Sequence, residues 1–142
     1  MKKVFVSLLF FMFLSCGKEV IENNCFRGIT LTETIYLKNA EFINLETPGR
    51  SATTNLGNRN IVIINTGSTP KYKAFDLQCP QKDCSSPMTI NYPRLECPCS
   101  DKKYSMLSGC PINNNGNCIR DGSCFALEYN VIQTGNTLQI SI

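Results

Sequence analysis

Two pairs of cysteines stand close together in the middle of the chain, at a spacing typical of residues that act jointly. Four residues separate Cys79 from Cys84, and one residue separates Cys97 from Cys99. Cysteines paired in this way either bind a metal through their thiolates or close a disulfide. The two chemistries imply different functions, and the redox state of the compartment favours one or the other.

The N-terminus predicts an oxidising compartment. Two lysines precede an apolar run over residues 4–14, which is too short to span a bilayer and has the character of a signal peptide. The run leads to Cys16, which follows a serine and precedes a glycine, as in a bacterial lipobox. We therefore predict that residues 1–15 are a lipoprotein signal peptide and that Cys16 is lipidated.

This N-terminus also predicts the domain organisation and the location. We expect residues 16–24 to form a lipidated tether and residues 25–142 to form one β domain in the bacterial cell envelope. We favour the outer membrane, with the domain facing the periplasm or the cell surface. Without the two N-terminal lysines, the formal charge falls from +3 to +1. The predicted partner is therefore the membrane, reached through the lipid anchor; nucleic acid is disfavoured, and no protein partner can be named.

Eight cysteines remain when Cys16 carries the lipid. An even number in an oxidising compartment fits up to four disulfides, and about 105 pairings of eight cysteines are possible. Covalent links of this kind would support the small core of so short a domain. The eight are Cys25, Cys79, Cys84, Cys97, Cys99, Cys110, Cys118 and Cys124.

Structural zinc fits the pattern poorly. Zinc sites usually place two or more residues between paired ligands, whereas Cys97 and Cys99 are separated by one. An exported protein would also have to keep these thiols reduced. We therefore expect no metal from spacing alone.

Three segments around the cysteine pairs share a pattern with a known family. They are residues 74–84 (AFDLQCPQKDC), 95–100 (LECPCS) and 103–109 (KYSMLSG). These segments resemble a Rieske domain, and the resemblance extends loosely over residues 61–142. Rieske domains bind a 2Fe-2S cluster through two cysteines and two histidines. The resemblance implies an all-β fold, a small sandwich or barrel with an inserted two-loop cysteine subdomain.

The resemblance also marks four ligand positions. It places Cys79 and Gln81 in the first loop, and Cys97 and Ser100 in the second, where the family has a cysteine and a histidine in each. Gln81 and Ser100 thus stand where the histidines are expected, and the chain contains no histidine at all. Two imidazoles on one iron are what give a Rieske cluster its raised potential. A two-cysteine, two-histidine cluster is therefore not expected, and no cofactor is predicted.

Three roles remain for Cys79 and Cys97, which the family fold brings together. We favour a disulfide between them, because exposed thiols that meet in an oxidising compartment form one. A 2Fe-2S cluster bound by Cys79, Cys97 and two further cysteines, with Cys84 and Cys99 nearest, is the alternative. A reactive thiol pair is a third role, and it requires a base or a cation nearby to favour the thiolate. The resemblance also implies a disulfide between Cys84 and Cys99, which match two bracing cysteines of the family.

The other four cysteines have no counterpart in the family motif. We expect two more disulfides among Cys25, Cys110, Cys118 and Cys124, one inside residues 110–124 and one that ties Cys25 to that segment. Five scattered carboxylates are expected to be solvated: Asp76, Asp83, Glu96, Asp101 and Asp121. Three tyrosines near the cysteine loops are expected to pack in the core or at an edge: Tyr72, Tyr92 and Tyr104.

Short strands joined by turns must position these loops. The β-branched run 61–64 predicts a buried strand, and residues 72–77 its hairpin partner. Residues 125–133 and 137–142 predict a terminal hairpin. Residues 47–60 are rich in Gly, Ser, Thr and Asn, and most of them are interpreted as loop. Further expected elements are strands at 29–37, 88–92 and 103–107, a helical turn or loop at 38–45 pinned by Phe42 and Leu45, and an irregular insertion at 110–124.

Together these features predict an exported, lipid-anchored Rieske-like domain that has lost its cluster. We expect no enzymatic activity and a role as a disulfide-stabilised structural or binding module. The alternative is an electron-transfer protein with an atypical 2Fe-2S cluster. A thiol–disulfide redox component is a third possibility.

Overall fold

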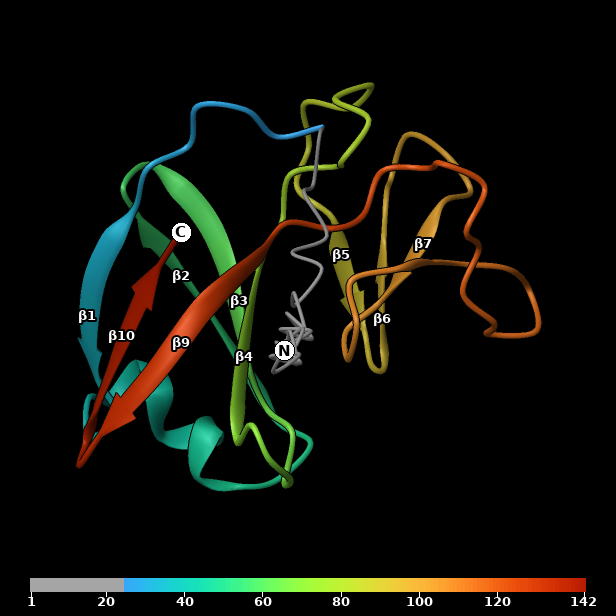
Figure 1. Ribbon diagram of the computed structural model, residues 1–142. Helices are drawn as coiled ribbons and strands as arrows, with labels where there is room; N and C mark the ends of the chain where they lie inside the picture. Colours follow the sequence, from blue (N-terminus) through green and yellow to red (C-terminus); the bar gives the residue numbers. More distant parts are fainter. Residues whose placement is uncertain (1–24) are drawn as a thin grey trace, which may run out of the picture.

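The structure is a computed structural model that describes residues 25–142. The predicted signal peptide, the predicted lipidation site Cys16 and the predicted tether all lie outside the described residues. The described chain forms two antiparallel sheets and one short 3-10 helix, with the smaller sheet beside the larger (Figure 1). The predicted all-β class is therefore confirmed. Within these residues, no helix is both long and apolar enough to cross a membrane.

The larger sheet contains strands from both ends of the described chain, in the order β1-β10-β9-β4-β3-β2. Pairing of β9 with β4 joins the C-terminal hairpin to the earlier strands. The strands are β1 (Thr32–Tyr36), β2 (Ser51–Leu56), β3 (Arg59–Asn65), β4 (Tyr72–Asp76), β9 (Glu128–Thr134) and β10 (Thr137–Ser141).

The smaller sheet is built wholly from the chain between β4 and β9, so it is an insertion into the larger one. Its order is β5-β6-β7-β8. The strands are β5 (Thr89–Asn91), β6 (Arg94–Glu96), β7 (Lys103–Ser105) and β8 (Pro111–Ile112). The two cysteine loops flank β5 and β6 and belong to this insertion. The predicted inserted cysteine subdomain is therefore confirmed.

Strand β3 separates two hydrophobic cores. Ile61 and Ile63 face the core of the larger sheet, whereas Val62 and Ile64 face a second core shared with the smaller sheet. All four side chains are fully buried. A strand buried on both faces needs a continuous apolar run in place of an alternating one, which is why this run was the clearest strand signal in the sequence.

The predicted helical turn is present as the 3-10 helix η1 (Ala40–Glu46). Phe42 and Leu45 are buried and pin the helix to the larger core, as expected. The buried amide of Asn65 donates a hydrogen bond of 2.8 Å to the carbonyl of Leu45. This bond satisfies a carbonyl at the helix end that has no partner within the helix, and it ties η1 to β3.

The interpretation of residues 47–60 as mostly loop was wrong. Residues 51–56 form β2, which pairs with β3 along its full length. A two-residue turn at Gly57 and Asn58 joins them, with φ angles of +53° and +62°. Positive φ at both central positions suits the twist of a tight hairpin, so a Gly-Asn pair before an apolar run was the missed signal. β2 was obscured because most of its side chains are polar and only one of its six residues is buried.

The remaining expected strands are present with shorter bounds. Strand β1 begins three residues later than predicted, and β5 and β7 have three residues each. The segment 110–124 is irregular as expected, apart from the two-residue strand β8.

Candidate functional site

The two cysteine loops face each other at the junction of the two sheets. The first loop follows β4, and the second follows β6. The structure joins Cys79 to Cys97, with their Cα atoms 5.8 Å apart, and Cys84 to Cys99, at 5.5 Å. These are the pairings favoured from the sequence. Each disulfide crosses from one loop to the other, so the loops are held together by two neighbouring covalent links.

Tight backbone turns orient the paired cysteines. The amide of Lys82 donates to the carbonyl of Cys79 at 2.9 Å, and the amide of Ser100 donates to the carbonyl of Cys97 at 3.3 Å. Lys82 takes a left-handed conformation with φ of +56°. Two loops of similar shape thus present their first cysteines to one another.

The Cys79–Cys97 disulfide is buried within the second core. Cys79 is fully inaccessible and Cys97 is 4% exposed. Leu95, Tyr104 and Met106 belong to the same buried cluster. The two outer cysteines differ, because Cys84 is buried whereas Cys99 is exposed. Reagents in solvent can therefore reach the outer disulfide more easily than the inner one.

The other two positions implied by the Rieske resemblance do not supply metal ligands of the expected kind. The side chain of Gln81 is exposed to solvent. The hydroxyl oxygen of Ser100 is buried and has no hydrogen-bond partner among residues 25–142. Both sulfurs of the pair Cys79 and Cys97 are bonded to each other. A Rieske cluster needs two thiolates and two imidazoles, so the residues present do not fit that group.

The remaining cysteines form two further disulfides. Cys25 is joined to Cys124, with 5.8 Å between Cα atoms, and Cys110 is joined to Cys118, with 5.6 Å. The Ser108 hydroxyl lies 3.0 Å from the Cys110 sulfur. One link therefore closes the irregular segment, and the other ties the start of the described chain to it.

One of the five carboxylates does not behave as expected. Asp76 is only 1% exposed, so its interpretation as a solvated residue was wrong. Its Oδ2 atom pairs with Arg59 Nε and accepts a hydrogen bond of 2.7 Å from the Tyr129 hydroxyl. Its Oδ1 atom accepts a hydrogen bond of 2.7 Å from the backbone N–H of Gln78. A buried carboxylate requires such compensation, which here comes from three separate segments.

Arg59 and Tyr129 share this network with Asp76. Arg59 also donates from Nε to the Tyr129 oxygen at 3.1 Å and from Nη2 to Gln78 Oε1 at 2.9 Å. Burial raises the pKa of Tyr129 well above its usual range, and the hydrogen bond to Asp76 raises it further. Tyr129 therefore stays a hydrogen-bond donor at any ordinary pH. A signal for this network was present in the sequence, since strand alternation places Asp76 on the same face as the apolar Tyr72 and Ala74.

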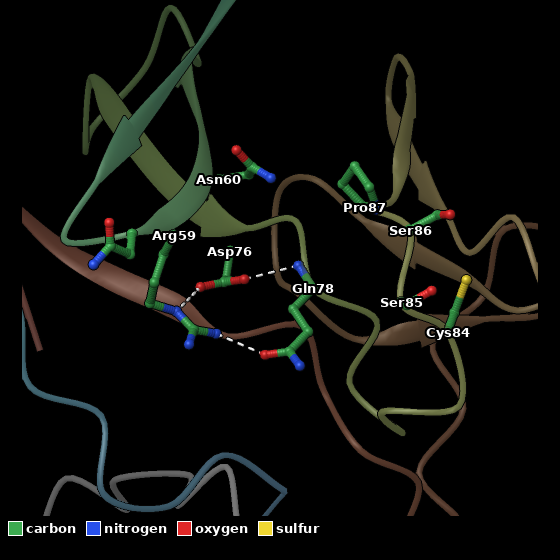
Figure 2. A pocket seen from close by; sticks show the side chains of 9 residues that line it. Arg59, Asn60, Asp76, Gln78, Cys84, Ser85, Ser86 and Pro87 are labelled. Carbon is green, nitrogen blue, oxygen red and sulfur yellow. Dashed lines mark hydrogen bonds and ion pairs between the residues drawn. The ribbon is translucent and has the colours of Figure 1, made fainter.

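A polar pocket opens beside this network (Figure 2). Its volume is about 320 Å³. One side is the start of β3 and the end of β4, and the other side is the segment 84–87 of the first cysteine loop. The lining residues are Asn58, Arg59, Asn60, Asp76, Gln78, Cys84, Ser85, Ser86 and Pro87. Sequence reasoning did not identify this pocket, because its two sides meet only in the folded chain.

The three tyrosines near the cysteine loops take two kinds of position. Tyr72 and Tyr104 are buried, in the first and second core respectively. Tyr92 is 51% exposed, in the turn between β5 and β6. Burial raises the pKa of Tyr104 to about 12, and the negative charge of Asp83 adds to the shift.

Comparison with known proteins identifies the fold. No family model matches the sequence, and no curated protein shows significant similarity to it. A quaternary ammonium Rieske monooxygenase, CntA, crystallised with an inhibitor, is similar in structure with a TM-score of 0.51 and 16% identity. The match covers 78% of this chain and 30% of the monooxygenase. Because the identity is low, this similarity is evidence for the fold alone. It confirms the predicted Rieske-like fold.

Two smaller proteins also align. The ferredoxin of carbazole 1,9a-dioxygenase from Nocardioides aromaticivorans IC177 has a TM-score of 0.45 and 14% identity, over 66% of this chain and 86% of the ferredoxin. A putative small subunit of an NADPH nitrite reductase has a TM-score of 0.45 and 13% identity, over 76% of this chain and 97% of the subunit.

Proposed function

We propose that this chain is an exported, lipid-anchored Rieske-like domain that carries no Rieske cluster and serves as a disulfide-stabilised binding module. The observation that supports this most strongly is the buried disulfide between Cys79 and Cys97. The resemblance places these two residues at the cysteine ligand positions of the family. Metal binding needs free thiolates, and sulfurs joined in a buried disulfide cannot supply them.

The surroundings of the disulfide support the same proposal. Leu95, Tyr104 and Met106 pack in the same core as the disulfide, with at most 1% of each exposed. A sealed apolar environment protects a disulfide from thiolates in solvent. The inner link therefore suits a permanent structural role better than a redox cycle.

A non-enzymatic role fits the chemistry of Asp76, which is the one buried carboxylate among residues 25–142. Both oxygens of Asp76 already accept hydrogen bonds, from Gln78, Tyr129 and Arg59. A general base needs an oxygen that is free to take a proton from substrate. Asp76 is better suited to holding Arg59 in place than to proton transfer.

An electron-transfer protein with an atypical 2Fe-2S cluster is the second candidate. The observation in its favour is that the two loops bring Cys79, Cys84, Cys97 and Cys99 into two neighbouring pairs. Four thiolates are a sufficient ligand set for a 2Fe-2S cluster. This candidate requires both inter-loop disulfides to be absent from the mature protein.

One set of measurements separates these candidates. The full chain is produced in a bacterial host, extracted from its membranes in mild detergent and assayed for iron, acid-labile sulfide and visible absorption. Free thiols are counted after unfolding without reductant. We expect a colourless protein with neither iron nor free thiol. Stoichiometric iron and sulfide would overturn the proposal in favour of electron transfer, and free thiol without iron would favour the redox component.

The lipid anchor needs its own test, because Cys16 lies outside the described residues. Mass spectrometry of the mature chain should find a diacylglycerol-modified Cys16 as its first residue. In cell fractionation, the wild-type chain should remain with the membranes. The Cys16→Ser variant should not be processed at this position. An unmodified mature N-terminus at another residue would refute the anchor while leaving the domain assignment intact.

A further inference from the structure

The polar pocket beside Arg59 has features of a binding site that the disulfide scaffold alone does not require. It lies where the larger sheet meets the first cysteine loop, and its volume of about 320 Å³ is sufficient for a small ligand. Figure 2 shows the Arg59, Asp76 and Gln78 side chains on one side and the segment 84–87 on the other. The Cys84–Cys99 disulfide pins the loop side.

Arg59 is held rigidly but is not fully used. The guanidinium edge formed by Nε and Nη2 is occupied by Asp76, Tyr129 and Gln78. Nη1 has no hydrogen-bond partner among the described residues. The side chain is 21% exposed, compared with 2% for Asp76. The carboxylate therefore anchors the guanidinium from the buried side, and an unsatisfied edge of the cation remains accessible.

Several other groups at the pocket can donate hydrogen bonds to a ligand. The carbonyl oxygen of Gln78 is taken by Arg59, which leaves its amide NH₂ free within the described chain. The carbonyl oxygen of Asn60 accepts a bond from Asn55 at 3.3 Å, which leaves the Asn60 NH₂ free in the same sense. The hydroxyls of Ser85 and Ser86 add two more groups that can donate.

The charged acceptor in the lining, the Asp76 carboxylate, is already engaged. Among the described residues, Asp76 is the only carboxylate in the lining, and it accepts three hydrogen bonds from the protein. A ligand that meets the accessible edge of Arg59 and the NH₂ groups of Gln78 and Asn60 must supply acceptors there. Carboxylates match a guanidinium edge with two parallel hydrogen bonds.

We propose that this pocket binds a carboxylate-bearing ligand, with Arg59 as its charged anchor. Gln78 and Asn60 donate to the remaining oxygens, and Ser85 and Ser86 contact the ligand from the loop side. The proposal deepens the proposed function, since it gives the binding module a site and a ligand class. The carboxylate can belong either to a small free acid or to the C-terminus of a peptide.

Titration with matched probes distinguishes these sources. The full chain in detergent is labelled with ¹⁵N, and amide shifts are followed with succinate, with acetyl-Ala-Ala as the free acid and with acetyl-Ala-Ala-amide. We expect the free acids to shift amides of residues 58–60, 78 and 84–86, and the peptide amide to leave them unchanged. Binding of succinate alone identifies a small free acid, and tighter binding of the peptide acid identifies a C-terminus.

Two variants place the carboxylate at this pocket. Arg59→Gln removes the anchor and should weaken binding of the better acid by about tenfold or more. This change also leaves the buried Asp76 carboxylate without its cationic partner. A second variant is therefore chosen that keeps the hydrogen-bond network intact. Asn60→Asp replaces a donor by a repelling carboxylate on an exposed side chain and should weaken binding to a similar degree. Asn91→Asp, which adds the same charge to exposed β5, should leave binding unchanged.

Three outcomes would overturn the inference. They are the absence of shifts with every acid, equal shifts with the peptide acid and its amide, and unchanged binding by the folded Asn60→Asp variant. None of them bears on the metal and thiol assays, which test the proposed function separately. Conversely, an iron-loaded protein that still binds the acids at this pocket would refute only the proposed loss of the cluster.

Discussion

Tyr129 on β9 donates its hydroxyl hydrogen to Asp76 on β4 at 2.7 Å, although the two stand 53 positions apart in the sequence. These strands border the inserted subdomain on either side, since it occupies the chain between them. The bond therefore adds a side-chain link between the paired strands that precede and follow the insertion. It also holds the carboxylate that anchors Arg59.

Tyr129→Phe should lower the free energy of unfolding by about 1.5–3 kcal/mol, because a buried charged acceptor loses a donor. Urea denaturation checks this through a lower midpoint at an unchanged slope. Tyr36→Phe is a matched control, since Tyr36 is 59% exposed; its expected effect is within about 0.5 kcal/mol. Equal stability of Tyr129→Phe and wild type would show that this hydrogen bond contributes nothing.

Alkaline pH should destabilise the fold partly through Tyr104. Its pKa is raised to about 12 in the folded chain by burial and by the charge of Asp83, against about 10 when unfolded. Stability from a group with a raised pKa is complete below the unfolded pKa and is lost as the pH rises through the folded one.

Between pH 10 and 12, ionisation of Tyr104 should lower the free energy of unfolding of the wild type by about 2 kcal/mol. Urea denaturation across this range measures the loss. Tyr104→Phe should show a correspondingly smaller decline, and Tyr36→Phe should follow the wild type. Parallel curves for Tyr104→Phe and wild type would rule out this contribution.

The four disulfides should contribute unequally to stability. The links Cys25–Cys124 and Cys110–Cys118 have sequence separations of 99 and 8. In the chain-entropy model, a longer closed loop restricts the unfolded chain more. Alanine replacement of the first pair should cost about 4–5 kcal/mol, and of the second about 2–3 kcal/mol.

Urea denaturation without reductant compares these two double variants, after peptide mapping has shown that the other disulfides are unchanged. The reverse order of stability would mean that native-state contacts, and not chain entropy, dominate their contribution.

Gly57→Ala should destabilise the β2–β3 hairpin. Gly57 has φ of +53°, and a Cβ atom there would lie 2.6 Å from the Leu31 side chain. Backbone strain and this clash together should cost about 2–4 kcal/mol. Gly116→Ala is a control for strain alone, because φ is +81° and, apart from its two chain neighbours, no residue of the described chain comes within 4 Å of its Cβ position.

Gly116→Ala should cost about 1 kcal/mol. Thermal or urea unfolding of both variants checks the difference. Equal losses would show that Leu31 moves away without cost.

The sequence by itself determined the elements whose signal is local. Strand β3 was predictable because burial on two faces demands an uninterrupted apolar run, and the terminal hairpin because two alternating segments flank a Gly-Asn turn. The Rieske-like fold was predictable from two cysteine loops at a family spacing. β2 was missed because its residues are mostly polar and show no apolar alternation. It becomes a strand through its pairing with β3.

The tertiary structure decided which groups meet where the sequence left alternatives open. Eight cysteines allow about 105 pairings. The family resemblance pointed to Cys79–Cys97 and Cys84–Cys99, whereas the fold decided that Cys25 joins Cys124 and that Cys110 joins Cys118. In the sequence, Asp76 is a carboxylate at the end of an expected strand. Its role follows from the fold, in which β9 brings Tyr129 to it and β3 brings Arg59. The polar pocket exists because the cysteine loop folds back against β3 and β4. Local sequence determines the strands and turns that carry a clear apolar pattern, whereas long-range contacts depend on how the strands pair, which no short segment encodes.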